Sequence, residues 1–187
     1  MKRKILIIAI LIICLAGLTG GTIAYFTAED TATNVITAGN LSIELVETAL
    51  DAEGETVPFR DVVGVVPGSQ VSKIVRVENT GDTAAYVRVR LETAIFLAEG
   101  KDGQVDLSLV TVDINTESWT EKDGYYYCNT VVQPGELTPP LFTKVTFDAG
   151  MDNRYTESTV KLNVHAQATQ WKNNGQSALE ASGWPEM

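Results

Sequence analysis

Few side chains of this sequence have the chemistry and the spacing that a metal site requires. The chain has a single histidine, His165. A zinc peptidase holds its ion with two or three imidazoles, or equivalent ligands, and adds a carboxylate base, usually as H-E-x-x-H on a helix. No tight group of Asp and Glu accompanies His165 in the sequence. We therefore interpret His165 as a solvated strand residue, and we predict no metal, no cofactor and no catalytic residue.

Three other groups invite a chemical interpretation, and each has a plainer one. Asp148, Asp152 and Asn153 offer oxygen ligands of the kind that calcium takes. Their spacing fits no calcium loop, which favours an acidic turn. Cys128 has no neighbouring base that would activate its thiol, which favours a buried structural cysteine. The tyrosines at 125–127 offer a stacking surface for a sugar or a protein, although strand propensity also explains them.

Composition and charge restrict the partners. The 187 residues are 44% hydrophobic and 20% charged, which is typical of a globular chain and excludes wholesale disorder. The net charge is −10, and removal of the basic residues at positions 2–4 would make it more negative. Such a surface repels phosphate backbones, so nucleic acid is not an expected partner. Loss of Cys14 with the leader would leave Cys128 as the one thiol, without an intramolecular disulfide.

Residues 1–24 have the three parts of a secretion signal. Basic residues at 2–4 precede an unbroken apolar run over 5–18, and small residues follow at 20–22. We predict cleavage after Ala24, with Thr22 and Ala24 as the small residues that a signal peptidase accepts and Tyr25 as the new first residue. An uncleaved anchor is the alternative, but the apolar run is shorter than the roughly 20 residues that span a bilayer. Membrane contact is expected only through the uncleaved signal peptide.

Residues 25–39 form an N-terminal arm that cleavage would free. The arm is rich in Thr, Val and Ile, which favour strands. Such a segment can pair with the exposed sheet edge of another subunit, and a head-to-tail contact of this kind propagates into a fibre. The alternative is that the arm folds onto its own domain or stays unpaired. The candidate assembly residues are Tyr25, Phe26, Thr31, Thr33, Val35, Ile36 and Thr37.

From residue 40 onward the pattern is an alternation of period two, interrupted by Gly, Pro, Asn and Asp. The clearest strand spans 85–92, where Ala, Val, Val and Leu alternate with Tyr, Arg, Arg and Glu. In the strand at 71–78 the apolar row has one misfit, Lys73. The predicted strands cover residues 41–45, 71–78, 85–92, 105–109, 125–128, 144–147 and 159–169.

One-sided alternation is typical of antiparallel sheets with one buried and one solvated face. Two such sheets bury both apolar faces when they stack. We therefore predict an all-β fold, an antiparallel, jelly-roll-like β-sandwich after an N-terminal signal helix. The predicted organisation is a signal peptide (1–24), the arm (25–39), the sandwich domain (40–170) and a C-terminal tail (171–187).

The connections carry further predictions. The turn at 79–82 holds Asn and Gly, which accept positive φ, so it is expected to reverse the chain into the next strand. That reversal would bring the charges of the two strands together as cross-strand ion pairs. Residues 57–68, with two prolines, are expected to be an edge strand or a long connection. In the tail we expect a helical turn near 178–181 and docking of Trp184. The charges expected to pair are Lys73, Arg76 and Glu78 with Arg88, Arg90 and Glu92.

Several segments, in the same order, resemble the TasA and camelysin family of exported Gram-positive proteins. The most specific is the leader junction GGTIAYFT at 20–27, which resembles the site cut by a signal peptidase of the SipW type. The other similar segments are residues 33–41, 66–68, 77–81, 123–127, 134–136 and 166–170. The resemblance covers residues 20 to about 170.

This resemblance implies a jelly-roll fold, a secreted or surface location and a role in the extracellular matrix fibres of biofilms. The leading hypothesis is a non-enzymatic matrix protein whose partners are itself or other matrix proteins, besides the signal peptidase. A monomeric cell-surface module that binds a partner through its loops is the alternative. An exported, camelysin-like metalloprotease is a weaker one, because one histidine does not make the family's peptidase site.

Overall fold

A computed structural model of the protein describes residues 41–60 and 66–185. The predicted leader, the predicted arm and the cleavage residues Thr22, Ala24 and Tyr25 all lie outside the described residues. Within the described ranges, no helix is both long enough and apolar enough to cross a bilayer.

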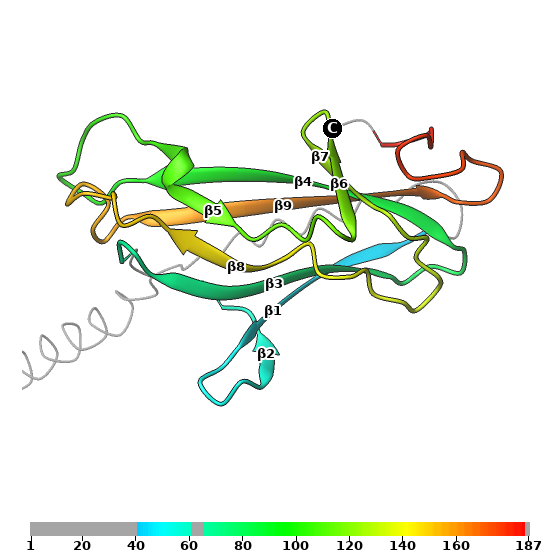
Figure 1. Ribbon diagram of the computed structural model, residues 1–187, viewed down its shortest axis with the longest axis horizontal. Coiled ribbons are helices and arrows are strands. Elements are labelled where there is room, and N and C mark those ends of the chain that lie inside the picture. Colours follow the sequence, from blue (N-terminus) through cyan, green and yellow to red (C-terminus); the bar gives the residue numbers. More distant parts are fainter. Residues whose placement is uncertain (1–40, 61–65, 186–187) are drawn as a thin grey trace, which may run out of the picture. The chain divides into compact units, whose positions relative to one another are not determined.

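The described chain forms two antiparallel sheets that stack face to face (Figure 1). Sheet 1 contains β1 (Ile43–Leu50), β2 (Thr56–Pro58), β3 (Gln70–Asn79), β5 (Val110–Val112) and β8 (Phe142–Phe147), in the spatial order β2-β1-β3-β8-β5. Sheet 2 contains β4 (Ala85–Phe96), β6 (Trp119–Lys122), β7 (Tyr125–Cys128) and β9 (Thr159–Gln170), in the order β6-β7-β4-β9. The predicted all-β antiparallel sandwich is confirmed.

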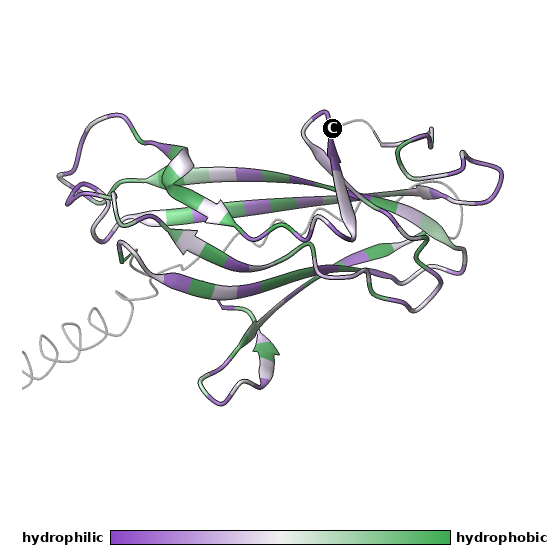
Figure 2. Cartoon of the chain, in the orientation of Figure 1, coloured by the Kyte–Doolittle hydropathy of each residue, from purple (hydrophilic) through white to green (hydrophobic). Residues whose placement is uncertain are grey.

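The core lies between the sheets and takes side chains from every strand except the short edge strand β2. Val75 and Val77 of sheet 1 and Val87 and Val89 of sheet 2 have no exposed surface. Figure 2 shows the resulting bands of hydrophobic and hydrophilic residues along the long strands. Full burial of one such side chain contributes about 1.5–3 kcal/mol, so these rows dominate the stability of the sandwich.

The turn at 79–82 leads from β3 into the next strand, β4, as predicted, but the chain crosses from sheet 1 to sheet 2 there. β3 pairs with β1 and β8, whereas β4 pairs with β7 and β9. The fully buried Asn79 explains the crossing, because its Nδ2 donates to the carbonyl oxygens of Thr83 (2.8 Å) and Val132 (2.9 Å). The bond to Val132 fastens the connection to a segment more than fifty residues away.

The ion pairs predicted between the charges of β3 and those of β4 are wrong, because the two strands lie in different sheets. On β4, Arg88 faces Gln167 and Arg90 faces His165, both from β9. Neither arginine lies beside a charge of β3, because the two strands belong to opposite layers.

Lys73, the misfit of the apolar row, does lie on the inner side of β3. Its side chain is buried and its Nζ is 2.9 Å from a carboxylate oxygen of Glu47 on β1. The ammonium group also lies 4.1 Å from the ring centroid of Phe59. The charge is thus tolerated inside because an ion pair and an aromatic ring replace the water it loses.

The strand predicted at 105–109 is wrong, and a strand at 119–122 was missed. Leu107–Leu109 form a 3₁₀ turn, η1, and β5 begins only at Val110. The carboxylate of Asp106 accepts hydrogen bonds from the backbone N and the Oγ of Ser108 (3.0 and 2.6 Å), which favours a turn over a strand. The sequence of β6 is mostly polar, and its buried side chain is that of Trp119.

The edge strand β2 and the C-terminal tail lie as the sequence predicts. β2 lies at the edge of sheet 1, as expected for the proline-containing segment after residue 57. The C-terminal tail folds over the outer face of sheet 2, where Trp184 docks as predicted. The expected helical turn is a single turn, closed by a hydrogen bond from Glu180 N to Ser177 O (3.2 Å).

Candidate functional site

His165 lies on the outer face of sheet 2, as its place in the alternation predicts. Its Nε2 is 3.6 Å from a carboxylate oxygen of Glu92, and Glu92 also pairs with Arg90 at 3.3 Å. Arg90 is the residue directly opposite His165 on β4. An adjacent guanidinium disfavours a second cation, so these surroundings suit an ion pair rather than a zinc ion. Across the described ranges no group of three or more His, Cys, Asp or Glu residues has the arrangement to hold a metal.

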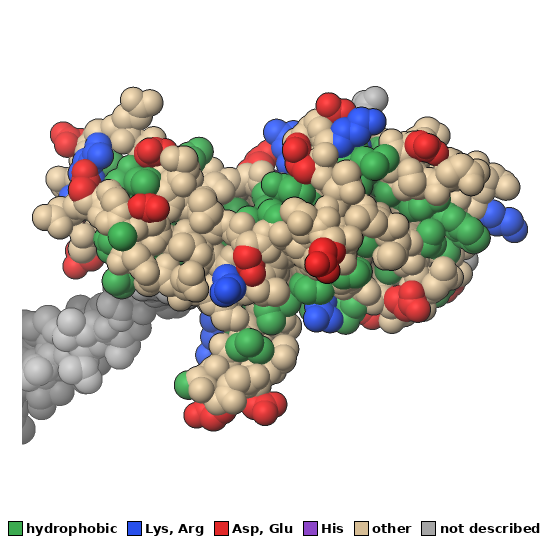
Figure 3. All heavy atoms as spheres, in the orientation of Figure 1, with side chains coloured by type: hydrophobic (Ala, Val, Ile, Leu, Met, Phe, Trp, Pro, Cys, Tyr) green, Lys and Arg blue, Asp and Glu red, His purple; other side chains and the backbone are tan. Residues whose placement is uncertain are grey.

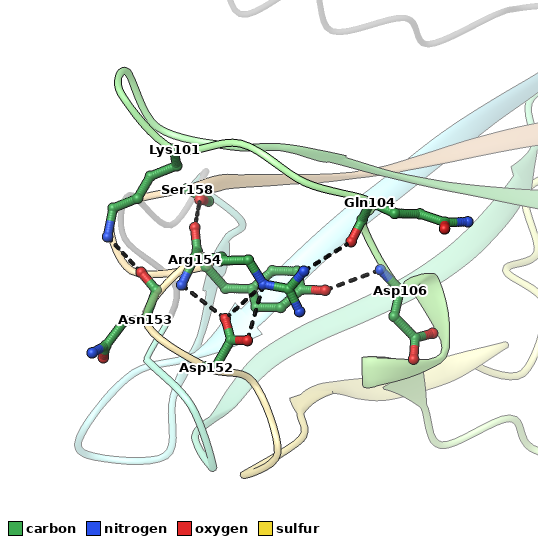
Figure 4. Close-up of polar contacts among 8 residues, drawn as sticks. Lys101, Gln104, Asp106, Asp152, Asn153, Arg154 and Ser158 are labelled. Carbon is green, nitrogen blue, oxygen red and sulfur yellow. Dashed lines mark hydrogen bonds and ion pairs between the residues drawn. The ribbon is translucent and has the colours of Figure 1, made fainter.

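The acidic turn at 148–153 lies beside the loop that follows β4, and its oxygens have protein donors (Figure 4). The carboxylate of Asp152 accepts from the Nε of Arg154 at 2.9 and 3.0 Å and from its backbone N at 2.8 Å. These hydrogen bonds lower the pKa of Asp152. Asp148 accepts from Gly150 N (2.6 Å), and the backbone carbonyl of Asn153 accepts from Lys101 Nζ. The two carboxylates therefore stabilise their own turn, and Lys101 links that turn to the loop after β4.

The Cys128 thiol belongs to the main core. The residue is 1% exposed, and its Sγ lies 3.5 Å from the Oγ1 of Thr130. Its free thiol is sealed from solvent, so the predicted burial of this cysteine is confirmed. A buried thiol without an activating cation is not a nucleophile.

The tyrosines of β7 divide between the two faces of sheet 2. Tyr126 packs against the main core, where burial and then the Glu121 carboxylate raise the pKa of its phenol. Tyr125 and Tyr127 point outward and join a second, smaller hydrophobic cluster with Trp184 of the tail. The ring centroids of Tyr127 and Trp184 are 5.7 Å apart in an edge-on arrangement.

Arg88 occupies the centre of this outer cluster, a role that sequence reasoning missed. Its guanidinium carbon lies 4.0 Å from the ring centroid of Tyr125 and 4.6 Å from that of Trp184. Its Nε donates to the Oε1 of the buried Gln167 at 2.7 Å, and its Nη1 donates to the Tyr127 hydroxyl at 3.3 Å. The rings of Tyr125 and Trp184 are thus engaged by the protein's own arginine and not left bare for a sugar.

Sheet 2 ends in a long edge strand, β9. β4 pairs with it from Gln170 to Thr159, and no strand of the described chain pairs with its other side. Ala85 exchanges both backbone hydrogen bonds with Val132 (3.0 and 2.9 Å), so its N–H and C=O point away from β9. The alternation of an antiparallel ladder then directs the backbone groups of the even-numbered residues 160–170 to the open side of β9. These groups are a template for one more strand.

The residues predicted for cleavage and assembly are not placed relative to this edge. Thr22, Ala24 and Tyr25, and the arm residues Phe26, Thr31, Thr33, Val35, Ile36 and Thr37, lie outside the described residues. The open edge itself carried no sequence signal, because the alternation of β9 is the same whether one or two strands pair with it.

The sequence was compared with known families and proteins. A family described as camelysin metallo-endopeptidase matches residues 1–123, which is about two thirds of the chain. The match ends in the turn between β6 and β7, so it includes the first strands of both sheets. No curated protein and no solved structure matches the chain.

Proposed function

Because the chain belongs to the camelysin metallo-endopeptidase family, whose members are exported, we propose that it is a secreted structural protein of the extracellular matrix. In this proposal the signal peptide is removed after Ala24 by a SipW-type peptidase. The arm at 25–39 then adds as a strand to the sheet edge of a neighbouring molecule, and repetition gives a fibre of the kind found in biofilms.

The open side of β9 is the observation that carries the proposal. It presents a row of backbone donors and acceptors along a twelve-residue strand. The inner side chains of the same even-numbered residues include Val160, Leu162 and Val164, of which Val164 is buried and the other two are half-buried. An added strand would therefore gain main-chain hydrogen bonds and would cover the apolar side chains that remain half-exposed at this edge.

The arm has the properties that an added strand needs. Its Thr, Val and Ile content favours an extended backbone. Processing then acts as the switch, because the arm cannot reach another subunit while the leader still tethers it. Since the arm of one molecule meets the edge of the next, the contact is head-to-tail and does not close on itself.

The family's name makes a metallopeptidase the second candidate. The residues present do not fit that chemistry. The chain has one histidine, and its imidazole faces Glu92 and Arg90 on a solvated sheet face, with no group of three or more metal-ligating side chains in the part of the chain that the structure describes. We expect purified protein to leave casein intact, and chelator-sensitive cleavage would overturn the non-enzymatic proposal.

Electron microscopy of the protein recovered from culture medium tests the proposed assembly. Proline removes the backbone donor that a strand ladder needs, so a Val35→Pro, Thr37→Pro variant is expected to form no fibres. The matched control exchanges the same side chains, Val35→Thr with Thr37→Val, and keeps every N–H and the strand propensity. Fibres from the control but not from the proline variant support strand addition. Fibres from both variants, or none from the unaltered chain, overturn it.

A further inference from the structure

The outer face of sheet 2 concentrates positive charge on an acidic protein. Strand register and alternation place Arg88 and Arg90 of β4, Lys122 of β6 and Lys161 of β9 on this one face. Glu92 is the carboxylate that shares the outer rows of these strands. Three positive charges are thus in excess here, although the whole chain has a net charge of −10.

Most of these cations have no ionic partner. Glu92 pairs with Arg90 and His165. Among the ion pairs of the described residues none includes Arg88, Lys122 or Lys161. Gln167 and the Tyr127 hydroxyl accept from two N–H groups of Arg88, and the rings of Tyr125 and Trp184 lie against its guanidinium, so Arg88 keeps its positive charge on this face without a carboxylate.

Sheet 1 carries the opposite charge on a protruding hairpin. The turn between β1 and β2 holds Asp51, Glu53 and Glu55, all exposed, and Figure 3 shows acidic side chains at the tip of this hairpin. The Asp51 carboxylate accepts hydrogen bonds from the backbone N of Glu53 (3.0 Å) and of Glu55 (2.8 Å), which stiffens the turn. Gly54, with φ of 85°, provides the left-handed residue that the turn requires.

The acidic tip and the basic face cannot meet within one molecule, because the tip belongs to sheet 1 and the basic face is the side of sheet 2 that points away from sheet 1. We infer that the acidic β1–β2 tip of one copy docks on the basic outer face of sheet 2 of another copy. This contact rests on the proposed self-assembly and adds its second surface. It joins two different patches, so it propagates rather than closing into a dimer.

Simple electrostatics sets the character of this contact. Exposed ion pairs are individually weak and are screened over about 8 Å at physiological salt. One docking event is therefore weak and sensitive to salt. Repetition along a fibre, where many copies are held at high local concentration, makes the same contact effective.

A charge-swap experiment on the protein recovered from culture medium tests the contact. The tip variant carries Glu53→Lys and Glu55→Lys, and the face variant carries Arg90→Glu and Lys161→Glu. Each variant alone brings like charges together, so its self-association at about 20 mM salt is expected to fall on the order of tenfold. A one-to-one mixture restores complementary pairs in both directions and is expected to recover association, as measured by sedimentation velocity.

The matched control reverses two exposed acids elsewhere, Glu99→Lys and Asp102→Lys in the loop after β4, with the same change in net charge as the tip variant. It is expected to associate like the unaltered chain. Failure of the mixture to recover association, or an equal loss in the control, overturns the contact. Recovery in the mixture also shows that both variants fold. The arm is unchanged in all of these chains, so this outcome is independent of the proline test of strand addition.

Discussion

The two outer faces of the sandwich differ in what lies on them. The outer face of sheet 1 carries charges that reach solvent, with the exposed Glu44 directly opposite the half-buried Glu78 and with Arg76 nearby. On sheet 2, the tail covers one half of the outer face and builds a second hydrophobic cluster around Tyr86, Tyr127 and Ala178.

Both faces have the same polar alternation in the sequence. The difference shows that a row of polar residues in a strand pattern does not indicate whether solvent or another segment of the chain covers that row. The comparison predicts that substitutions on the covered half of sheet 2 are costly, whereas matched substitutions on solvated surfaces are nearly neutral.

The largest effect is expected for Trp184→Ala. The change removes a half-buried indole that packs on Tyr127 and on the Arg88 guanidinium, so it should lower the free energy of unfolding by about 2–3 kcal/mol. Trp171, which is 44% exposed, is the matched control, and Trp171→Ala should cost less than about 0.5 kcal/mol. Urea unfolding followed by circular dichroism gives both values. Equal losses would mean that the tail does not stabilise the sheet.

Replacement of one arginine on each outer face sharpens the comparison between the two faces. Arg88→Met keeps most of the side-chain volume but removes the hydrogen bonds to Gln167 and Tyr127 and the cation between two rings, so about 1–2 kcal/mol should be lost. Arg76→Met on the outer face of sheet 1 should change stability by less than about 0.5 kcal/mol. Thermal unfolding of the two variants side by side is the measurement, and a larger loss at Arg76 contradicts the assignment.

A smaller effect, and one that depends on pH, is expected in sheet 1. The Asp113 carboxylate accepts from the backbone N of Thr143 (2.8 Å) and Lys144 (2.6 Å) and from the Thr143 hydroxyl (2.6 Å), beside the register shift between β3 and β8. Burial alone raises the pKa of Asp113, but the hydrogen bonds together outweigh it and lower this pKa. A lowered pKa stabilises the fold above the unfolded-state value of about 3.9, and this contribution is lost as the pH falls through the folded-state pKa.

Asp113→Asn should therefore lower the free energy of unfolding at pH 7, because it removes the charge that these hydrogen bonds stabilise. The loss should be only about 1 kcal/mol, because solvent reaches the carboxylate and screens it. The difference from the unaltered chain should shrink as the pH falls below about 4, where the aspartate itself becomes neutral. Urea midpoints of both chains at a series of pH values provide the comparison. A gap that stays constant with pH would show that the shape of the side chain, and not its charge, supports β8.

The smallest effect is expected for His165→Gln, on the uncovered half of sheet 2. The imidazole is partly exposed and makes a long contact of 3.6 Å with Glu92, so stability at pH 7 should change by less than about 0.5 kcal/mol. Zinc content, measured by mass spectrometry after purification without chelator, should be the same for both chains. Loss of bound zinc with the histidine would contradict its interpretation as a strand residue.

Sequence alone predicted the strands that alternate cleanly and failed where local hydrogen bonds or polar sequences intervene. β4 and β9 were found because each buries an unbroken apolar row. Residues 107–109 were assigned to a strand because the side chain of Asp106 and its bonds to Ser108 are invisible to a pattern of hydrophobicity. β6 was missed because its burial depends on Trp119 reaching the core from a polar strand.

The candidate site divides in the same way. The outward-facing position of His165 followed from its place in the alternation, and the burial of Cys128 and the docking of Trp184 were also predicted. The aromatic enclosure of Arg88 did not, because its parts come from β4, β7 and the tail, which only the folded chain brings together.

By itself, the sequence determined that this chain is all-β and which row of each regular strand faces inward, because the side-chain alternation of a strand is a property of the local backbone. Tertiary structure decided which sheet each strand joins. The hydrogen bond from Asn79 to Val132 sends the chain across the core, and the place of β9 at the end of the order leaves one of its sides unpaired by any strand of the described residues. Such choices depend on contacts between residues far apart in the chain, which a local pattern does not contain.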